Sequence, residues 1–544
     1  MRRLVSTGNL SNAGVYLSPI QEEYFINFFW QTYHTSLFPI LDETQFKQHY
    51  QSLWVSGGKD RKPSALVDII IAMCMQHGIS ALPSDTQGFL VEGKDALVAG
   101  RWHFWRGQTL LTYELESPSL STLQCHLLCS VYLCGGSFHN MLDNSIGQAV
   151  RTAYALGLHL DPSPNMSEKD REMRRCLWWA VYLMDSKVGM KLGRPFMLRD
   201  SHVMPCLPSD SFNAARMSGS AFAPIGDDST WLSYNIQQTQ LYIKVRAAYT
   251  GYYDQELHLR DGHTIWDDRH ALEASAEALF PHIQILKEWS NNVPDALKLK
   301  RHNSGRPLST DGTRLLLEQF APLWLQRQRV LLEHSYHHLS INLYRPLISF
   351  SSKPSPGSPA EEIAMRCASH AIMLSKITQQ ALADTSILDG WHEAFHCQWN
   401  AAMTLIGFVI VYRNAPLTAE ARSAIDLAVD VFDNFGAKFS VAANAATIMR
   451  DLCVKVDLLV KHNQSQRDPL NGLQTIFMDD PMSITEDLSL DSSSISSMRD
   501  WNSYTNDLAP DLTLFDMAVD LDFWNSLDAL YPEADNLSQY RSEI

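Results

Sequence analysis

Apolar residues recur every three to four positions along most of this chain, and that period is typical of helices that pack on a core. The set Tyr24, Phe25, Phe28, Phe29 and Tyr33 is one example. The same spacing predicts helices over residues 19–37, 42–50, 66–76, 90–113, 120–134, 141–156, 167–192, 231–257, 268–289, 312–345, 361–384, 389–412, 417–436 and 440–462. Because no stretch shows sustained alternation of apolar and polar residues, we expect an all-α fold.

The helix expected at 167–192 has clear local signals at both ends. Ser167 suits the N-cap position, Gly193 suits a left-handed C-cap, and Pro195 prevents the helix from continuing. Its residues 172–185 read Glu-Met-Arg-Arg-Cys-Leu-Trp-Trp-Ala-Val-Tyr-Leu-Met-Asp, which is apolar on most sides. A helix of this kind is usually buried, so we expect it in the core.

The charged residues of this helix need partners. An unpaired buried carboxylate is costly, so Asp185 requires a cation, and Arg194, just past the C-terminal turn, is the expected one. Arg174 and Arg175 lie one turn before the two tryptophans and are expected to stack on an indole or to pair with an acid. No reactive group is placed here for catalysis, so we interpret the helix as structural, with the arginines and Asp185 as its braces.

These residues resemble the signature of a known family. Arg174, Arg175, Trp178, Trp179 and Asp185, followed by Gly193, Arg194 and Pro195, resemble the fungal-specific transcription factor domain, the middle homology region of fungal zinc-cluster regulators. Segments 38–42, 149–159 and 342–346 resemble further motifs of that family, so the likeness spans roughly residues 20–350 and extends more loosely to about 460. It implies a helical regulatory domain in a nuclear transcriptional activator, not an enzyme, that controls a metabolic or secondary-metabolite gene set.

Composition suggests how the chain is divided. Residues 1–17 lack periodicity, which predicts a disordered arm before a regulatory domain at 18–348 with its core motif at 167–200. Residues 349–360 are rich in Ser and Pro, which predicts a linker before a helical part at 361–463. Residues 464–544 are expected to be a largely disordered acidic tail: positions 476–544 carry 15 acidic and 2 basic side chains, so they hold 13 of the chain's 16 net negative charges.

The tail contains a stretch, residues 507–531, in which aspartates are interleaved with large apolar side chains. Such a mixture is typical of activation segments, because repulsion between the aspartates keeps the apolar side chains exposed. A coactivator groove is then expected to capture a short helix from this stretch. The anchoring residues are expected to be Phe515, Leu521, Phe523, Trp524 and Leu527. The alternative is a C-terminal helix that docks on the core.

One short motif suggests a metal site. His392, Glu393 and His396 form a His-Glu-x-x-His sequence, in which the two histidines of a helix can hold zinc and the glutamate can act as a base. Trp399 stands where the metzincin extension requires glycine, and no sheet is predicted before the motif. We therefore expect these histidines to be packed or on the surface, and we predict no protease and no metal or catalytic site.

Two other clusters have simpler interpretations. Residues 333–338 contain three histidines with, at best, the spacing of two ligands, and we interpret them as one face of a helix. Cys125, Cys129 and Cys134 follow a helix face instead of forming Cys-x-x-Cys knuckles, so we expect them to pack in the core.

The resemblance also implies an N-terminal DNA reader with six cysteines and two zinc ions. This chain has no Cys-x-x-Cys, its first cysteine is Cys74, and the basic loop at 59–62 is too small for the phosphate contacts that DNA binding needs. We expect no cofactor in this chain, with zinc only in a cluster missing from the sequence. Otherwise, a zinc-cluster partner or a homodimer would be needed. A coregulator without DNA binding and a helical small-molecule binder remain alternatives; no apolar run predicts a membrane span.

Overall fold

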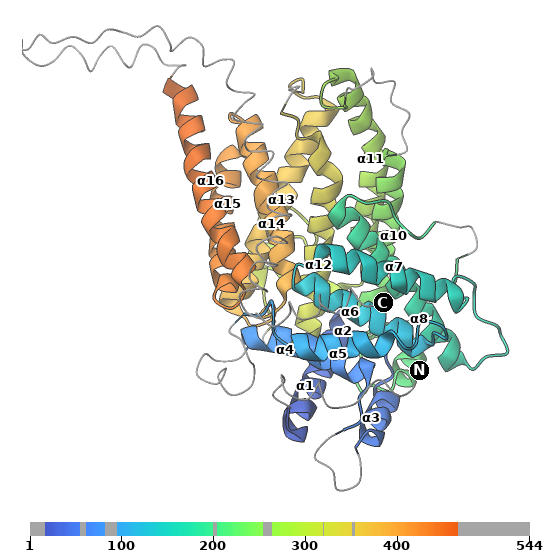
Figure 1. The fold of residues 1–544 in the computed structure, drawn as a ribbon. Helices are drawn as coiled ribbons and strands as arrows, with labels where there is room; N and C mark the ends of the chain where they lie inside the picture. Colours follow the sequence, from blue (N-terminus) through green and yellow to red (C-terminus); the bar gives the residue numbers. More distant parts are fainter. Residues whose placement is uncertain are drawn as a thin grey trace, which may run out of the picture. The chain divides into compact units, whose positions relative to one another are not determined.

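The computed structural model describes residues 17–54, 61–81, 95–199, 204–253, 264–318, 320–350 and 354–465. The chain divides into two compact units, residues 1–460 and 461–544, and nearly all of the described residues belong to the first (Figure 1). Three predictions lie outside the described residues: the disordered arm, apart from its last residue, the acidic tail, apart from residues 464 and 465, and the activation segment at 507–531.

The first unit is built from helices, and the predicted all-α class is confirmed for the described residues (Figure 1). In chain order they are α1 (Pro19–Gln31), α2 (Tyr33–Ser36), α3 (Glu43–Ser52), α4 (Ala65–Ala81), α5 (Arg101–Leu111), α6 (Leu120–Gly135), α7 (His139–Ala155), α8 (Glu168–Leu192), α9 (Phe212–Met217), α10 (Ser233–Tyr253), α11 (Arg269–Asn292), α12 (Leu323–Tyr344), α13 (Pro359–Asp384), α14 (His392–Val411), α15 (Thr418–Gly436) and α16 (Ser440–Ser465). Short 3-10 turns η2 (Asp295–Leu297), η3 (His302–Ser304) and η4 (Arg345–Leu347) and a two-stranded ribbon complete it.

Local signals account for many of the helix ends. The Ser18 and Ser167 side chains accept hydrogen bonds from the backbone amides of Gln21 and Asp170, which caps α1 and α8 as expected. At the other end of α8, Gly193 adopts the left-handed conformation, with φ +62°. Only glycine takes that conformation at little cost, so the predicted bounds of α8 are confirmed.

Four predicted segments differ from the structure. The helix expected at 19–37 is divided at Thr32 into α1 and α2. The helix expected at 90–113 begins at Arg101, because Gly100 has φ +73° and lies against the backbone of Ala72. The helix expected at 312–345 begins at Leu323, and the residues before it form strand β2 (Leu315–Leu316), antiparallel to β1 (Lys300–Arg301). Residues 212–217, for which no helix was predicted, form the short helix α9.

Helices distant in sequence pack side by side in this unit. α6 packs on α4 and α7, while α13 packs on α11, α12, α14 and α15 (Figure 1). Helix α8 packs on α6, α7, α9 and α10, so it joins the early helices to the later ones. Helix α8 is therefore in contact with helices that come both before and after it in the chain.

Among the described residues, α14 alone has the length and composition of a membrane span, with mean hydropathy 1.4 in its most apolar window. That window is 61% buried within the protein, and α14 packs on α13 and α15. Leu405 and Phe408, in its C-terminal half, are fully buried. The apolar character of α14 is therefore that of a core helix, which passes the same test of composition.

Candidate functional site

The predicted motif residues lie along α8 and the turn after it. Trp178 and Trp179 are buried, at 2% and 4% exposure, as expected for a core helix. The indole Nε1 of Trp179 donates to the carbonyl oxygen of Cys206 at 3.0 Å, whereas the indole Nε1 of Trp178 has no hydrogen-bond partner. Of the two neighbouring tryptophans, only Trp179 therefore ties α8 to the segment that begins at residue 204.

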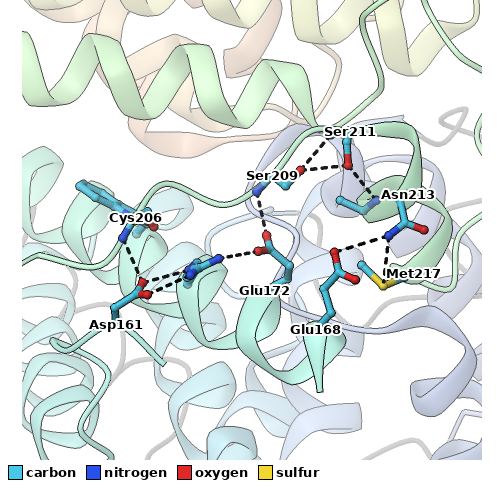
Figure 2. A network of polar contacts seen from close by, with 11 residues as sticks. Asp161, Glu168, Glu172, Cys206, Ser209, Ser211, Asn213 and Met217 are labelled. Carbon is cyan, nitrogen blue, oxygen red and sulfur yellow. Dashed lines mark hydrogen bonds and ion pairs between the residues drawn. The ribbon is translucent and has the colours of Figure 1, made fainter. Parts of the chain in front are cut away.

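The N-terminal half of α8 holds that segment through a network of polar contacts (Figure 2). Arg175 donates from Nε and Nη2 to the two carboxylate oxygens of Asp161, at 3.1 and 3.0 Å, and from Nη1 to Glu172 at 2.9 Å. Glu172 in turn accepts from the backbone amide of Ser209 at 2.7 Å, and Asp161 accepts from the amide of Cys206 at 3.3 Å. We call this set of five hydrogen bonds the α8 clasp.

The α8 clasp is mostly a surface feature. The Asp161 side chain is 47% exposed, and the hydrogen bonds from Arg175 lower its pKa below the usual value. The prediction that Arg175 pairs with an acid is confirmed, and Arg174 donates to the backbone carbonyl of Leu156 at 3.3 Å. Since such pairs are screened by water, the clasp orients the 204–217 segment more than it stabilises the body.

The expected partner of Asp185 is wrong. Asp185 pairs with Arg246 of α10 at 2.9 Å, and both side chains are about 2% exposed or less. Arg194 instead points to α7, where it pairs with Asp143 and donates to Asn140. The Arg194 side chain is 42% exposed at the surface, whereas the Asp185 side chain is 2% exposed, so the cation that pairs with Asp185 comes from another buried helix.

The buried pair also holds the chain that follows Pro195. The two carboxylate oxygens of Asp185 accept from the backbone amides of Met197 and Leu198, at 2.9 and 3.1 Å. The guanidinium of Arg246 lies over the Phe196 and Tyr182 rings, 4.1 and 4.7 Å from their centroids, and donates to the carbonyl oxygen of Leu198. Asp185 is thus the point where α8, α10 and the Gly-Arg-Pro turn meet.

The His-Glu-x-x-His residues occupy the start of α14 and are engaged with the protein. Glu393 forms an ion pair with Lys187 of α8, and His396 Nε2 lies 3.2 Å from the Ser137 hydroxyl. Burial lowers the pKa of His392 to about 4, so that ring is neutral near pH 7. No group of three or more His, Cys, Asp or Glu side chains within the described ranges is arranged to hold a metal ion.

The other clusters are internal. Glu333 pairs with Arg301 of β1, and His337 Nδ1 lies 2.9 Å from Nδ1 of His370 on α13. The helix face at 333–338 therefore lies largely within the core, which spacing alone did not indicate. Cys125, Cys129 and Cys134 are buried on α6, as expected for core cysteines.

A cavity beside Lys187 and Glu393 is the feature that sequence reasoning missed. It is lined from α2, α4, α6, α8, α10, α12 and α14, that is, by residues between Tyr33 and Cys397. Burial disfavours the Lys187 ammonium, but the Glu393 carboxylate outweighs that effect and raises its pKa. Lys187 was the one residue that could have indicated this cavity from the sequence, because it is the only cation between residues 176 and 190, in the largely apolar part of α8.

Comparisons with known proteins agree with the resemblance. A family model described as the fungal specific transcription factor domain matches residues 26–222, which include α8 and the α8 clasp. The chain is 59% identical over 462 residues to "Transcription factor asqA" of Emericella nidulans, covering 84% of this chain and 82% of that protein. It is 34% identical over 457 residues to "Terreic acid cluster-specific transcription factor atF" of Aspergillus terreus, covering 81% and 68%.

A more distant relative agrees with these two. The "Oosporein cluster regulator OpS3" of Beauveria bassiana is 23% identical over 425 residues, covering 71% of this chain and 54% of that protein. The match to asqA covers 84% of this chain, so the family assignment extends beyond residues 26–222, which the family model matches. The chain therefore belongs to the fungal transcription factors that carry the fungal-specific transcription factor domain, and it is a transcriptional regulator rather than an enzyme.

Proposed function

We propose that this protein is a nuclear activator of a secondary-metabolite gene set. The observation that carries the proposal is the role named for the relatives: one that is 34% identical is a cluster-specific transcription factor, and another is a cluster regulator. Secondary-metabolite genes of this kind are adjacent to one another, so a dedicated regulator acts on neighbouring genes together.

The proposed division of labour follows the charge distribution. Residues 18–348, with the core motif at 167–200, and residues 361–463 form the regulatory body, and 349–360 link them. Residues 464–544 form the activation tail, since positions 476–544 hold 13 of the 16 net negative charges. Acidic residues repel nucleic acid, so the tail suits coactivator proteins as partners.

DNA contact in this proposal comes from a zinc-cluster segment. The nine cysteines of the sequence include no Cys-x-x-Cys knuckle, and all but Cys176 and Cys206 are buried among helices. The segment would belong either to a separate zinc-cluster protein that pairs with this chain or to a further part of this protein, which could then act as a homodimer. Co-purification from nuclear extract, followed by identification of a zinc-cluster protein, would support a partner.

The activation tail is tested with the full chain fused to a heterologous DNA-binding domain and a matching reporter. Phe523→Ala with Trp524→Ala should remove most of the reporter signal, because anchoring aromatic residues carry most of the energy in such interfaces. Leu488→Ala with Leu490→Ala is the matched control, since it removes apolar side chains from the same tail outside 507–531. Equal signals from the two double variants would contradict the proposal for residues 507–531.

The gene set and the location are tested in the native fungus. Deletion of the gene should lower the transcripts of its genomic neighbours, and a fluorescent fusion of the full chain should accumulate in the nucleus. Unchanged neighbouring transcripts under conditions in which the protein is present would refute the cluster-specific role. Exclusion of the fusion from the nucleus would refute direct action on transcription.

A further inference from the structure

The cavity beside Lys187 lies where helices from both halves of the regulatory body converge. Met184 and Lys187 come from α8, Tyr242 comes from α10, and Trp391 precedes α14. About 70 Å³ of the cavity is open to the centres of water molecules, whereas one water needs only about 10–15 Å³ on that measure. The space therefore holds several waters or the ring of a small molecule.

A half-buried ion pair forms one wall of this cavity. The Lys187 and Glu393 side chains keep 21% and 32% of their surface accessible, and both line the cavity. Burial is nevertheless the largest influence on both pKa values, although their mutual attraction outweighs it and keeps both groups charged. Both side chains therefore contribute to a wall of the cavity that is polar and has no net charge.

Other polar groups of the wall lack partners. The side-chain Nε2 of Gln76 and the hydroxyl of Ser36 are buried at 2% exposure and make no hydrogen bond. Tyr242 also lines the cavity, and burial raises its pKa, so its hydroxyl stays protonated and can donate. Buried polar groups without partners are costly, so this wall favours an occupant that carries hydrogen-bond acceptors.

The remaining wall is apolar and partly aromatic. Leu183, Met184 and Leu331 contribute aliphatic surface, and Tyr33 and Trp391 lie with their ring centroids 5.5 Å apart. Aromatic and aliphatic walls with a few placed polar groups are typical of sites for small ring compounds. A single extra charge is disfavoured here, because the ion pair already neutralises itself and a low-dielectric space penalises an unpaired ion.

We propose that this cavity is a ligand site for a small, uncharged ring compound that carries a carbonyl and a hydroxyl group. The carbonyl oxygen accepts from the Gln76 amide or the Tyr242 hydroxyl, and the hydroxyl group donates to Oε2 of Glu393, because the ion pair with Lys187 is made by Oε1. Because the wall joins α8 and α10 to α12 and α14, an occupant would couple the two halves of the regulatory body.

The proposal goes beyond the proposed function, since binding is measured on the purified full chain without DNA, coactivator or reporter. Titration calorimetry with para-hydroxyacetophenone, which is neutral and carries both groups, should show saturable binding to one site per chain. The anion para-hydroxybenzoate should bind at least tenfold more weakly, and toluene should also bind more weakly. A failed reporter assay with intact binding would refute only the activation tail.

Two variants locate the site. Tyr242→Phe removes one donor and should weaken binding of para-hydroxyacetophenone about fivefold, the ratio expected for one neutral hydrogen bond. Tyr252→Phe is the matched control, because it removes a buried hydroxyl from the same helix outside the cavity. Ser335→Leu fills space in the cavity from α12 and should abolish binding while the helical circular dichroism signal persists.

Three results would overturn the proposal. The first is no saturable binding of para-hydroxyacetophenone, which would leave a cavity that holds only water. The second is equal affinity for toluene, which would show a simple apolar void. The third is binding that neither Tyr242→Phe nor Ser335→Leu changes, which would place the ring compound elsewhere on the chain.

Discussion

Substitution of Asp185 is the sharpest test of how this body is held together. Asp185→Ala leaves the Arg246 guanidinium, which is 1% exposed, without its carboxylate partner. It also removes the acceptor of the Leu198 amide, in a residue that is 2% exposed. The Arg246 guanidinium and the backbone amides of Met197 and Leu198 therefore all lose the carboxylate that accepts their hydrogen bonds.

The magnitude follows from those contacts. Loss of one partner of a buried ion pair costs roughly 3–5 kcal/mol, because an uncompensated charge remains inside. The orphaned amide of Leu198 adds about 1 kcal/mol. The Met197 amide adds little, because Met197 is 39% exposed and water can replace the carboxylate. We expect Asp185→Ala to lower the free energy of unfolding by roughly 4–6 kcal/mol in total.

The assay is urea unfolding of the full chain, followed by circular dichroism of the helices. Asp161→Asn is the matched control, since it breaks the α8 clasp with the same kind of arginine–carboxylate contact at 47% exposure. It should cost at most about 1 kcal/mol. Asp185→Leu combined with Arg246→Leu should cost at least about 2 kcal/mol less than the sum of the two single variants, because no charge is left unpaired. A cost for Asp185→Ala no larger than that for Asp161→Asn would refute the reasoning.

Three further changes probe the turns and the core. Trp179→Phe should lower the free energy of unfolding by roughly 1–3 kcal/mol, because it loses the hydrogen bond to Cys206 and some packing; the urea midpoint measures this. Gly193→Ala should cost about 1 kcal/mol in the same assay, because φ is +62° while no atom obstructs the new methyl group. Burial lowers the pKa of His34 from 6.5 to about 3, so the stability that neutral His34 provides is complete above pH 6.5 and is lost as the pH falls from 6.5 to about 3. His34→Gln should therefore reduce the slope of the free energy of unfolding against pH in this range by about 1.4 kcal/mol per pH unit.

Each of these three changes has a matched control. Trp178→Phe keeps the packing change without a lost hydrogen bond, so it should cost about 1 kcal/mol less than Trp179→Phe. Gly147→Ala lies inside α7 with room for a methyl group, so it should stabilise the body by about 0.5–1 kcal/mol. The exposed residue His302 should leave the acid slope unchanged when replaced by Gln. If a variant and its control changed the free energy of unfolding, or its dependence on pH, by the same amount, the physical reason given for that variant would be contradicted.

The fold class and the bounds of α8 could be predicted because their causes are local. Helical periodicity, the Ser167 cap and the left-handed Gly193 each depend on neighbours within about one turn. The start of α12 could not be predicted in this way, since the pairing of β2 with β1 competes with the helical pattern of residues 312–322. The pairing of a strand with another segment does not change the local spacing of apolar residues, so that spacing cannot reveal it.

The candidate sites show the same division. Helical periodicity and residue chemistry were enough to predict that α8 is buried, that Asp185 needs a cation, and that a family signature surrounds it. The packing of the helices was needed to identify that cation as Arg246, 61 positions away in the chain, and to bring Lys187 to Glu393 in the wall of a cavity. A buried charge requires a partner in any fold, whereas the identity of that partner depends on how distant helices pack.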